Sequence, residues 1–309
     1  MTRTVGLVGA RGHTGRELLR LIAARSDLDL AFASSRELAG QPVNELAPEI
    51  APGLMFEALP ADAVAARQVD AVILALPNGA SAPFVAAINA VSPQTVIVDL
   101  SADYRFDESW TYGLPEIYGR EALRRTTRIA NPGCYATAGQ LAIAPLRDRL
   151  ASDPHVFGVS GYSGAGTTPS RKNDPDALHD NLMPYALTGH LHEQEMARHL
   201  GCEVRFTPHV AAFFRGILAT VHIALDAPVT HQALIALYED AYRGEPLVRV
   251  TTDMPEIRDG AGDPGAVIGG FGLSTDGCHV VVVCALDNLL KGAAVQALQN
   301  LCLALDLPE

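Results

Sequence analysis

Short apolar runs alternate with helical patterns through the first half of the chain. The runs lie at residues 5–8, 28–33, 71–76 and 95–100. Continuous apolar runs of this length are typical of strands that are buried on both faces. Strands that alternate with helices predict a parallel sheet with helices on both of its faces. The first half is therefore predicted to be a doubly wound α/β domain of the Rossmann type.

The pattern changes after Cys134. A stretch rich in Gly, Ser and Thr at residues 158–170 predicts a loop, and longer strand-like runs follow at 217–225 and 279–286. Residues 287–305 return to helical periodicity and are expected to pack back on the first domain. This part is predicted to be an α+β domain.

A chain of 309 residues exceeds the usual size of one hydrophobic core, and 48% hydrophobic residues can fill two. We predict one domain from residues 1–133 with 288–309, and a catalytic and oligomerisation domain from residues 134–287.

The formal charge of -12 argues against a nucleic-acid or membrane partner, because either would require a broad basic surface. No apolar run reaches the roughly 20 residues of a membrane span, and the first 15 residues resemble a strand that enters a turn rather than a signal peptide. A cytoplasmic protein is expected.

The chain has five cysteines, and no two of them form a C-x-x-C pair. An odd number without that spacing argues against both a disulfide framework and a zinc site. At most one cysteine is therefore expected to act chemically. The five are Cys134, Cys202, Cys278, Cys284 and Cys302.

A glycine turn directly follows the first predicted strand and opens a helix. Its glycines, Gly9, Gly12 and Gly15, have the spacing G-x-x-G-x-x-G rather than the commoner G-x-G-x-x-G. Such a turn lets the backbone approach a phosphate at the helix N-terminus. A tight turn without a ligand is the alternative, but the position after a strand favours dinucleotide binding.

The second predicted strand ends at Ser34, Ser35 and Arg36. An NAD-specific enzyme usually has an acidic residue at this position to bind the ribose hydroxyls. Serines and an arginine suit a 2′-phosphate instead, so NADP is predicted over NAD. The alternative is that Arg36 is only a solvated surface charge.

Cys134 follows Asn131, Pro132 and Gly133, and it precedes an apolar run at 138–144 that predicts a helix. The positive end of a helix dipole lowers the pKa of a cysteine, and the thiolate is the nucleophile. We therefore predict that Cys134 attacks a carbonyl carbon, whereas the other four cysteines are assigned to packing.

A thiolate nucleophile requires a group that transfers protons. His190 and His192 are candidates, and Glu195 would lie beside His192 on a helix and could orient it. A metal site is the less favoured alternative, because no third ligand occurs at a recognised spacing. Incidental histidines at a solvated helix start are a second alternative.

Six motifs, in order along nearly the whole chain, resemble the N-acetyl-gamma-glutamyl-phosphate reductases of arginine biosynthesis. This family belongs to the same architectural group as aspartate-semialdehyde and glyceraldehyde-3-phosphate dehydrogenases. Residues 161–170 and 184–188 resemble the branch that forms the reductase half of fungal bifunctional enzymes. The motifs lie at residues 131–135, 100–105, 112–116, 163–166, 208–217 and 287–294.

The resemblance implies roles for individual residues. Cys134 is implied as the nucleophile and His192 as the acid/base, with His190 close by, and the sequence leaves open which histidine transfers the proton. The implied substrate contacts are Arg105, Ser163, Gly164, Tyr185, His190, Glu195 and Arg215. The implied cofactor contacts are Gly9, Arg11, Gly12, His13, Thr14, Gly15, Ser34, Ser35, Arg36, Pro77, Asn288 and Lys291.

The family reaction is the NADPH-dependent reduction of N-acetyl-gamma-glutamyl phosphate to N-acetylglutamate semialdehyde and phosphate through a cysteine thioester. Family members are commonly homotetramers, so a homo-oligomer is expected. The chain departs from the family pattern at Thr167, where many relatives carry Arg-Lys, and at residues 211–214. Another acyl-phosphate reductase, acting on aspartyl or aminoadipyl phosphate, and a redox-sensing regulator that binds NADP are the alternatives.

Overall fold

The computed structural model describes residues 2–309, and the chain divides into two compact units. The first unit contains the residues up to Pro132 together with Ala293–Glu309, and the second unit is Gly133–Gly292. In this division residues 288–292 lie in the second unit, whereas the sequence placed them in the first domain. The reason is that the Asn288 side chain bonds Ser163 and Gly216, both in the second unit.

The first unit is built on a seven-stranded sheet in which every neighbouring pair is parallel, in the order β3-β2-β1-β4-β5-β7-β6. This order confirms the predicted doubly wound sheet. The strands are β1 (Arg3–Val8), β2 (Leu28–Ser34), β3 (Phe56–Glu57), β4 (Ala71–Leu74), β5 (Val96–Asp99), β6 (Thr111–Tyr112) and β7 (Arg128–Ala130).

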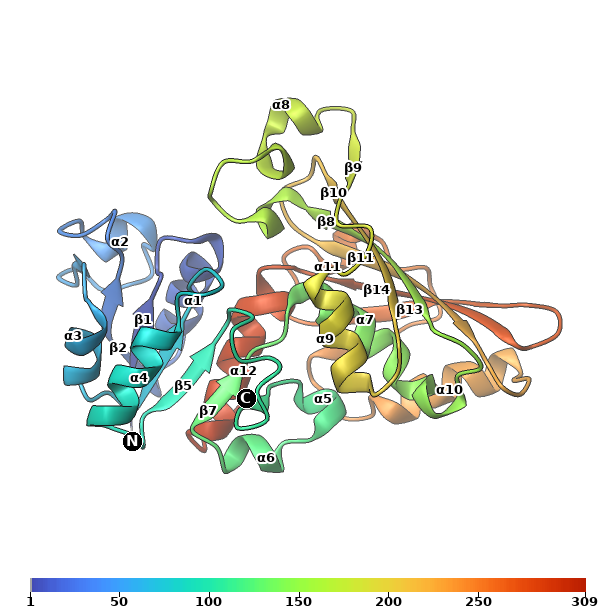
Figure 1. Ribbon diagram of the computed structural model, residues 1–309, viewed down its shortest axis with the longest axis horizontal. Helices are drawn as coiled ribbons and strands as arrows, with labels where there is room; N and C mark the ends of the chain where they lie inside the picture. Colours follow the sequence, from blue (N-terminus) through green and yellow to red (C-terminus); the bar gives the residue numbers. More distant parts are fainter. Residues whose placement is uncertain (1) are drawn as a thin grey trace. The chain divides into compact units, whose positions relative to one another are not determined.

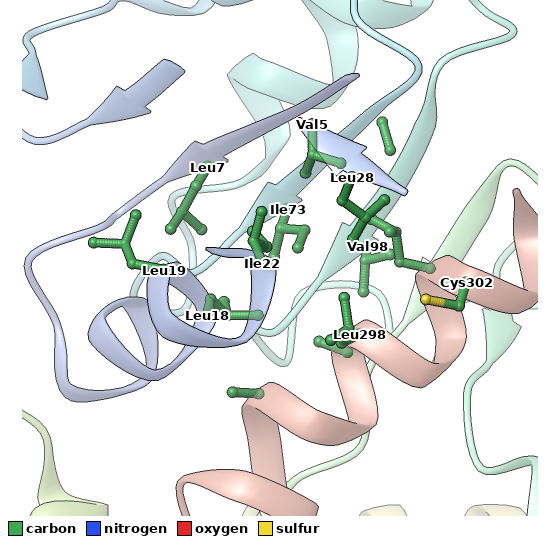
Figure 2. Close-up of a cluster of buried hydrophobic side chains, with 14 of the residues drawn as sticks. Val5, Leu7, Leu18, Leu19, Ile22, Leu28, Ile73, Val98, Leu298 and Cys302 are labelled. Atoms are coloured by element: carbon green, nitrogen blue, oxygen red, sulfur yellow. The ribbon is translucent and has the colours of Figure 1, made fainter. Parts of the chain in front are cut away.

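The helices of the first unit pack against both faces of this sheet. They are α1 (His13–Ala23), α2 (Val43–Leu46), α3 (Ala61–Ala66), α4 (Ala82–Val91), α5 (Pro115–Tyr118), α6 (Glu121–Arg124) and α12 (Val295–Ala304). On one face, α1 and α12 bury Leu18, Leu298 and Cys302 against strand residues such as Ile73, as Figure 2 shows. On the other face, Val64 of α3 joins a separate core.

The C-terminal helix starts later than predicted. Residues 287–289 are not helical, a short π-helical turn η4 (Leu290–Ala294) follows, and α12 begins at Val295. The delay has a physical cause, because the buried Asp287 carboxylate accepts hydrogen bonds from the backbone amides of Leu289 and Leu290. The side chain thus satisfies amides that a helix end leaves unpaired.

The second unit contains a mixed seven-stranded sheet in the order β12-β13-β14-β11-β8-β10-β9. The pairs β8 with β10 and β12 with β13 are parallel, and the other pairs are antiparallel. The strands are β8 (His155–Gly161), β9 (Leu182–Pro184), β10 (Arg205–Ala211), β11 (Ile217–Ala224), β12 (Val248–Val250), β13 (Ala266–Leu273) and β14 (His279–Leu286).

Three longer helices, α7, α9 and α10, lie along one side of this sheet in Figure 1. The helix α7 is deeply placed, since every residue after Cys134 is buried. The helical segments are α7 (Cys134–Ile143), α8 (Pro175–Leu178), α9 (Leu191–Leu200), α10 (His231–Ala241) and α11 (Ile257–Gly260), with short 3₁₀ turns η1 (Ala144–Arg149), η2 (Tyr162–Ala165) and η3 (Arg171–Asn173).

Two sequence predictions for the second unit need correction. Residues 158–161 are not a loop but the end of β8, and Gly158 is required there because the Tyr135 and Phe206 rings would lie within 2.9 Å of an added Cβ. The strand β10 was not predicted, because Pro208 in its middle argues against a strand. Among residues 2–309, no helix has the length and apolarity to cross a membrane.

Candidate active site

Cys134 is the first residue of α7, so the helix start predicted for this segment is confirmed. Gly133 forms the N-cap in an extended conformation, and the Cys134 residue is partly exposed. The amides of a first helical turn have no partner within the helix and carry partial positive charge. The sulfur atom is thus attached at the positive end of a ten-residue helix.

Glu195 holds the turn that precedes Cys134. Its carboxylate is completely buried, and Oε1 accepts a 2.8 Å hydrogen bond from the backbone amide of Gly133. The sequence predicted that Glu195 would orient His192 or contact the substrate. Both roles stay predictions, and the bond to Gly133 adds a third role, because it fixes the backbone immediately before Cys134.

His190 caps α9, the helix that carries His192. The Nδ1 atom of His190 accepts a 3.0 Å hydrogen bond from the backbone amide of His192, so its proton lies on Nε2. Burial lowers the pKa of His190, and the charge of Lys172 lowers it further. The two imidazole rings are 4.9 Å apart, and the ring of His192 lies 6.0 Å from that of Tyr135.

Tyr185 belongs to the same cluster of side chains. Its ring lies 5.7 Å from that of His190, and the Lys172 ammonium lies 4.8 Å from the centre of the Tyr185 ring. Burial raises the pKa of Tyr185, and the nearby thiol of Cys134 raises it further. Tyr185, His190 and Cys134 thus lie in one cluster of the second unit. The cluster also contains Lys172, to which the sequence assigned no role.

A second set of contacts is centred on Asn288. Its Oδ1 accepts from the amide of Gly216, and its Nδ2 donates to the Ser163 hydroxyl, each bond being 2.8 to 2.9 Å long. Ser163 is buried, whereas the adjacent Gly164 is exposed. Asn288 thereby joins the backbone next to Arg215 to the side chain of Ser163, and both Arg215 and Ser163 are predicted substrate contacts.

Asp287 was missed as a site residue by sequence reasoning. The carboxylate is fully buried and lies 2.8 Å from the Arg215 guanidinium, while it also accepts from the amide of Gly262. The one sequence signal for a role of Asp287 in the site was its position next to Asn288, a predicted cofactor contact. Lys291 is also completely buried, and an added Cβ at Gly292 would lie 2.7 Å from the Cβ of Cys134.

The glycine turn of the first unit has the shape expected for a phosphate site. Gly9 has φ +87°, and an added Cβ would lie 2.1 Å from the carbonyl oxygen of Ala75. Gly15 is equally crowded by Gly9, whereas the space around Gly12 is open except for one contact at 3.7 Å. The turn leads directly into α1, whose first residues are His13 and Thr14. An anion can approach the helix start at Gly12.

The end of β2 places two buried serines beside this turn. The Ser34 carbonyl accepts from the amides of Gly9 and Ala10, and the Ser35 hydroxyl accepts from the amide of Leu38. Arg36 is exposed, as is Pro77 beyond β4. Arg11 lies 3.7 Å from Glu37, an acidic residue that follows the predicted phosphate-binding residues.

Arg105 is buried in the first unit rather than extended into solvent. Its Nε donates to the carbonyl of Asn131 at 2.9 Å, and its Nη2 donates to the carbonyl of Leu100 at 2.8 Å. Both acceptors lie just after the ends of neighbouring parallel strands, β7 and β5. The guanidinium therefore holds two strand ends together at the carboxyl edge of the sheet.

Three of the other cysteines lie in less reactive settings. Burial raises the pKa of Cys284 to about 12 and that of Cys302 to about 11, and it also raises the pKa of Cys202. Thiols with raised pKa values are poor nucleophiles at neutral pH. Within residues 2–309, no group of three His, Cys, Asp or Glu side chains could hold a metal ion.

A parallel dinucleotide-binding sheet and a cysteine at a helix start beside two histidines define a class of oxidoreductase that acts on aldehydes or acyl phosphates. Residues 4–126 match the family "Semialdehyde dehydrogenase, NAD binding domain", and residues 134–288 match "Semialdehyde dehydrogenase, dimerisation domain". Within this group, the chain belongs to the N-acetyl-gamma-glutamyl-phosphate reductase family. The second domain implies a homo-oligomer.

The relatives that support this assignment cover the whole chain. An N-acetyl-gamma-glutamyl-phosphate reductase from Xanthomonas campestris is 58% identical, over 99% of this chain and 96% of its own. One from Stenotrophomonas maltophilia is 58% identical, over 100% and 97%. Among solved structures, aspartate semialdehyde dehydrogenase II from Vibrio cholerae is 18% identical, covers 99% of both chains and has a TM-score of 0.78, which shows a shared fold.

Proposed function

We propose that the protein catalyses the NADPH-dependent reduction of N-acetyl-gamma-glutamyl phosphate to N-acetylglutamate semialdehyde and phosphate. The observation that carries the proposal is the position of Cys134 at the start of α7, beside the histidines of α9, in a chain 58% identical to reductases with this name. The place of the reaction in arginine biosynthesis and a cytoplasmic location are part of the same proposal.

Cys134 is the proposed nucleophile. Its Sγ bonds to the acyl carbon while the bond from that carbon to the phosphate oxygen breaks, so a thioester forms and phosphate leaves with the electron pair. The amides of the first turn of α7 would stabilise the negative oxygen, and one well-placed donor of this kind contributes about 3 to 4 kcal/mol. The Gly133 amide is not available for this role, because Glu195 already accepts its hydrogen bond.

His192 is the proposed acid/base and His190 its neighbour. The Nδ1 of His190 is engaged by the α9 amide, so this ring has only the Nε2 proton to offer. His192 would take the thiol proton and would later protonate the alkoxide that hydride addition leaves. It would take that proton back as the C–S bond breaks, so that the aldehyde leaves and the Cys134 thiolate is restored. Glu195 is proposed to position the turn before Cys134, and its predicted roles in orienting His192 and contacting the substrate belong to the same proposal.

NADPH supplies the hydride that reduces the thioester. The crowded turn at Gly9 and Gly15, with open space at Gly12, fits a pyrophosphate at the start of α1. Ser34, Ser35 and Arg36 would bind the 2′-phosphate, and this choice of residues supports NADP over NAD. Asn288 and Lys291 are proposed to lie near the nicotinamide, and Pro77 to contact the cofactor from the loop after β4.

Substrate recognition is assigned to the residues that the family resemblance implies. Arg105 is the proposed carboxylate-binding group, with Tyr185 and Arg215 as further contacts. Ser163 and Gly164 would contact the acyl chain. The first unit is proposed to be the cofactor domain, and the second to catalyse the reaction and to form a dimer or tetramer.

A steady-state assay tests the function in the reverse direction. Purified protein should form NADPH from N-acetylglutamate semialdehyde, phosphate and NADP, with a kcat/KM at least 100-fold higher than with aspartate semialdehyde. Omission of phosphate should stop the reaction, because the thioester then has no acceptor. A preference for aspartate semialdehyde would replace the proposed substrate, and NADP binding without turnover of any aldehyde would indicate a regulator.

A further inference from the structure

The segment between β8 and β9 contains a cation to which neither the fold nor the proposed mechanism gives a role. Lys172 lies in the short turn η3, and the Asn173 side chain anchors that turn through bonds to the carbonyls of Gly166 and Thr168 at 2.9 and 2.8 Å. A capping box formed by Ser170 and Asn173 closes the same turn. The backbone that carries Lys172 is therefore held in place although it lies outside the sheet.

The Lys172 side chain contacts an aromatic ring instead of a carboxylate. Its ammonium lies 4.8 Å from the centre of the Tyr185 ring. Tyr185 is itself fixed, because its amide donates to the carbonyl of Pro208 and β9, just before it, pairs with β10. A cation over an aromatic face is attracted by the ring and keeps its full charge, so it can still bind an anion.

This charge acts on the side chains that surround the nucleophile. The positive charge of Lys172 helps to lower the pKa of His190, whose ring lies 5.7 Å from Tyr185. The thiol of Cys134 in turn raises the pKa of Tyr185. Lys172, Tyr185, His190 and Cys134 thus form one group within the second unit, and Lys172 is its cation.

We propose that Lys172 binds the phosphoryl group of the acyl phosphate, and inorganic phosphate in the reverse direction. This inference rests on the proposed function. As the bond from the acyl carbon to oxygen breaks, phosphate leaves with the electron pair and gains negative charge. A compact ammonium binds such a charge as a point charge. The Nε2 proton of His190 supplies a second donor.

Reverse-direction kinetics test this assignment with Lys172→Met, which keeps the length of the side chain and removes its charge. The KM for phosphate is expected to rise about 10- to 150-fold, the range for loss of a charge-assisted hydrogen bond, while the KM values for aldehyde and NADP stay within about twofold. Lys172→Arg should restore most of the affinity for phosphate. Arg171→Met, at the exposed neighbouring position, is the matched control and should change none of these values.

Two results would overturn the proposal. A rise in the KM for aldehyde with an unchanged KM for phosphate would show that Lys172 contacts the substrate carboxylate. Unchanged KM values for both would show that it binds neither anion. A wild type without phosphate-dependent activity would contradict the proposed function, and phosphate binding would then be tested without turnover. Inorganic phosphate should slow the alkylation of Cys134 by iodoacetamide in the wild type but not in Lys172→Met, and equal protection in both proteins would contradict the role of Lys172.

Discussion

The Glu195 carboxylate and the backbone amide of Gly133 are joined by a 2.8 Å hydrogen bond in the interior of the second unit. The bond connects α9, which carries His192, with the residue immediately before Cys134. Because a buried carboxylate beside a helix N-terminus also interacts favourably with the helix dipole, the contact stabilises the start of α7. The nucleophile and its proposed acid/base are therefore attached to two segments that are bonded to each other.

Glu195→Ala is expected to destabilise the protein by about 1 to 3 kcal/mol, because it leaves the buried Gly133 amide without an acceptor. Urea unfolding measures this change. Glu195→Gln keeps an acceptor oxygen and should recover much of the stability. If the alanine and glutamine variants were equally stable, the hydrogen bond to Gly133 would not be the important contact of Glu195.

Cys134→Ser is expected to abolish phosphate-dependent aldehyde oxidation while NADPH binding stays nearly intact, because a serine hydroxyl is a far poorer nucleophile than a thiolate at neutral pH. Iodoacetamide should label Cys134 before the other cysteines, since burial raises the pKa values of Cys202, Cys284 and Cys302. Mass spectrometry that found one of these three labelled first would contradict the assignment.

His192→Asn is expected to lower kcat by roughly 10² to 10⁴, the usual effect of removing a general acid/base, with a smaller effect on NADPH affinity. His190→Asn should be milder, because asparagine is a favourable N-cap and can accept the hydrogen bond that His190 accepts now. Steady-state kinetics of both variants decide between the histidines. A larger loss in His190→Asn would exchange their roles.

The stability of the wild type should depend on the titration of His190. Burial and the charge of Lys172 lower the pKa of His190 from its usual 6.5. At pH values between the lowered pKa and 6.5, the unfolded chain therefore binds more protons than the folded chain. Stability must then fall as the pH drops through that window. Urea unfolding between pH 8 and pH 5 should show a steeper fall for the wild type than for His190→Asn. Parallel curves would contradict the shift.

Arg36→Ala is expected to weaken NADP binding by about 10- to 150-fold and to leave NAD binding nearly unchanged, because the arginine would contact the 2′-phosphate with a bond worth roughly 1.5 to 3 kcal/mol. Titration of both cofactors measures this difference, which salt should reduce because Arg36 is exposed. Glu37→Gln is the control at the adjacent exposed position and should not weaken NADP binding. Equal losses for both cofactors would mean that Arg36 acts through folding.

Whether a strand could be predicted from the sequence depended on its length and its burial. The strands β1, β2, β4 and β5 contain apolar runs long enough to read in the sequence, and they confirm the first domain's architecture. The strands β3 and β6 have two residues each, too few for a periodic pattern. The strand β10 was missed because Pro208 cannot donate a ladder hydrogen bond, although the strand pairs on both sides.

The candidate site was less predictable than the fold, because its contacts join residues far apart in the sequence. Glu195 bonds a backbone amide 62 residues away, and Asn288 bonds a hydroxyl 125 residues away. No local spacing encodes such pairs. The sequence was enough to recognise a cysteine at the start of one helix and histidines at the start of another. The pairing of the buried Asp287 with Arg215 could be seen only in the folded chain.

The segment between β8 and α9 joins the sheet of the second unit through its two ends and the short strand β9, and Figure 1 shows α8 and β9 within it. A surface segment of this kind can change in length at little cost, since doubling a flexible loop adds only about 0.6 kcal/mol of closure entropy. A chimeric protein with another relative's version of residues 166–189 should therefore fold normally. Changes in this segment can therefore alter the affinity of the site for anions while the sheet of the second unit keeps its fold.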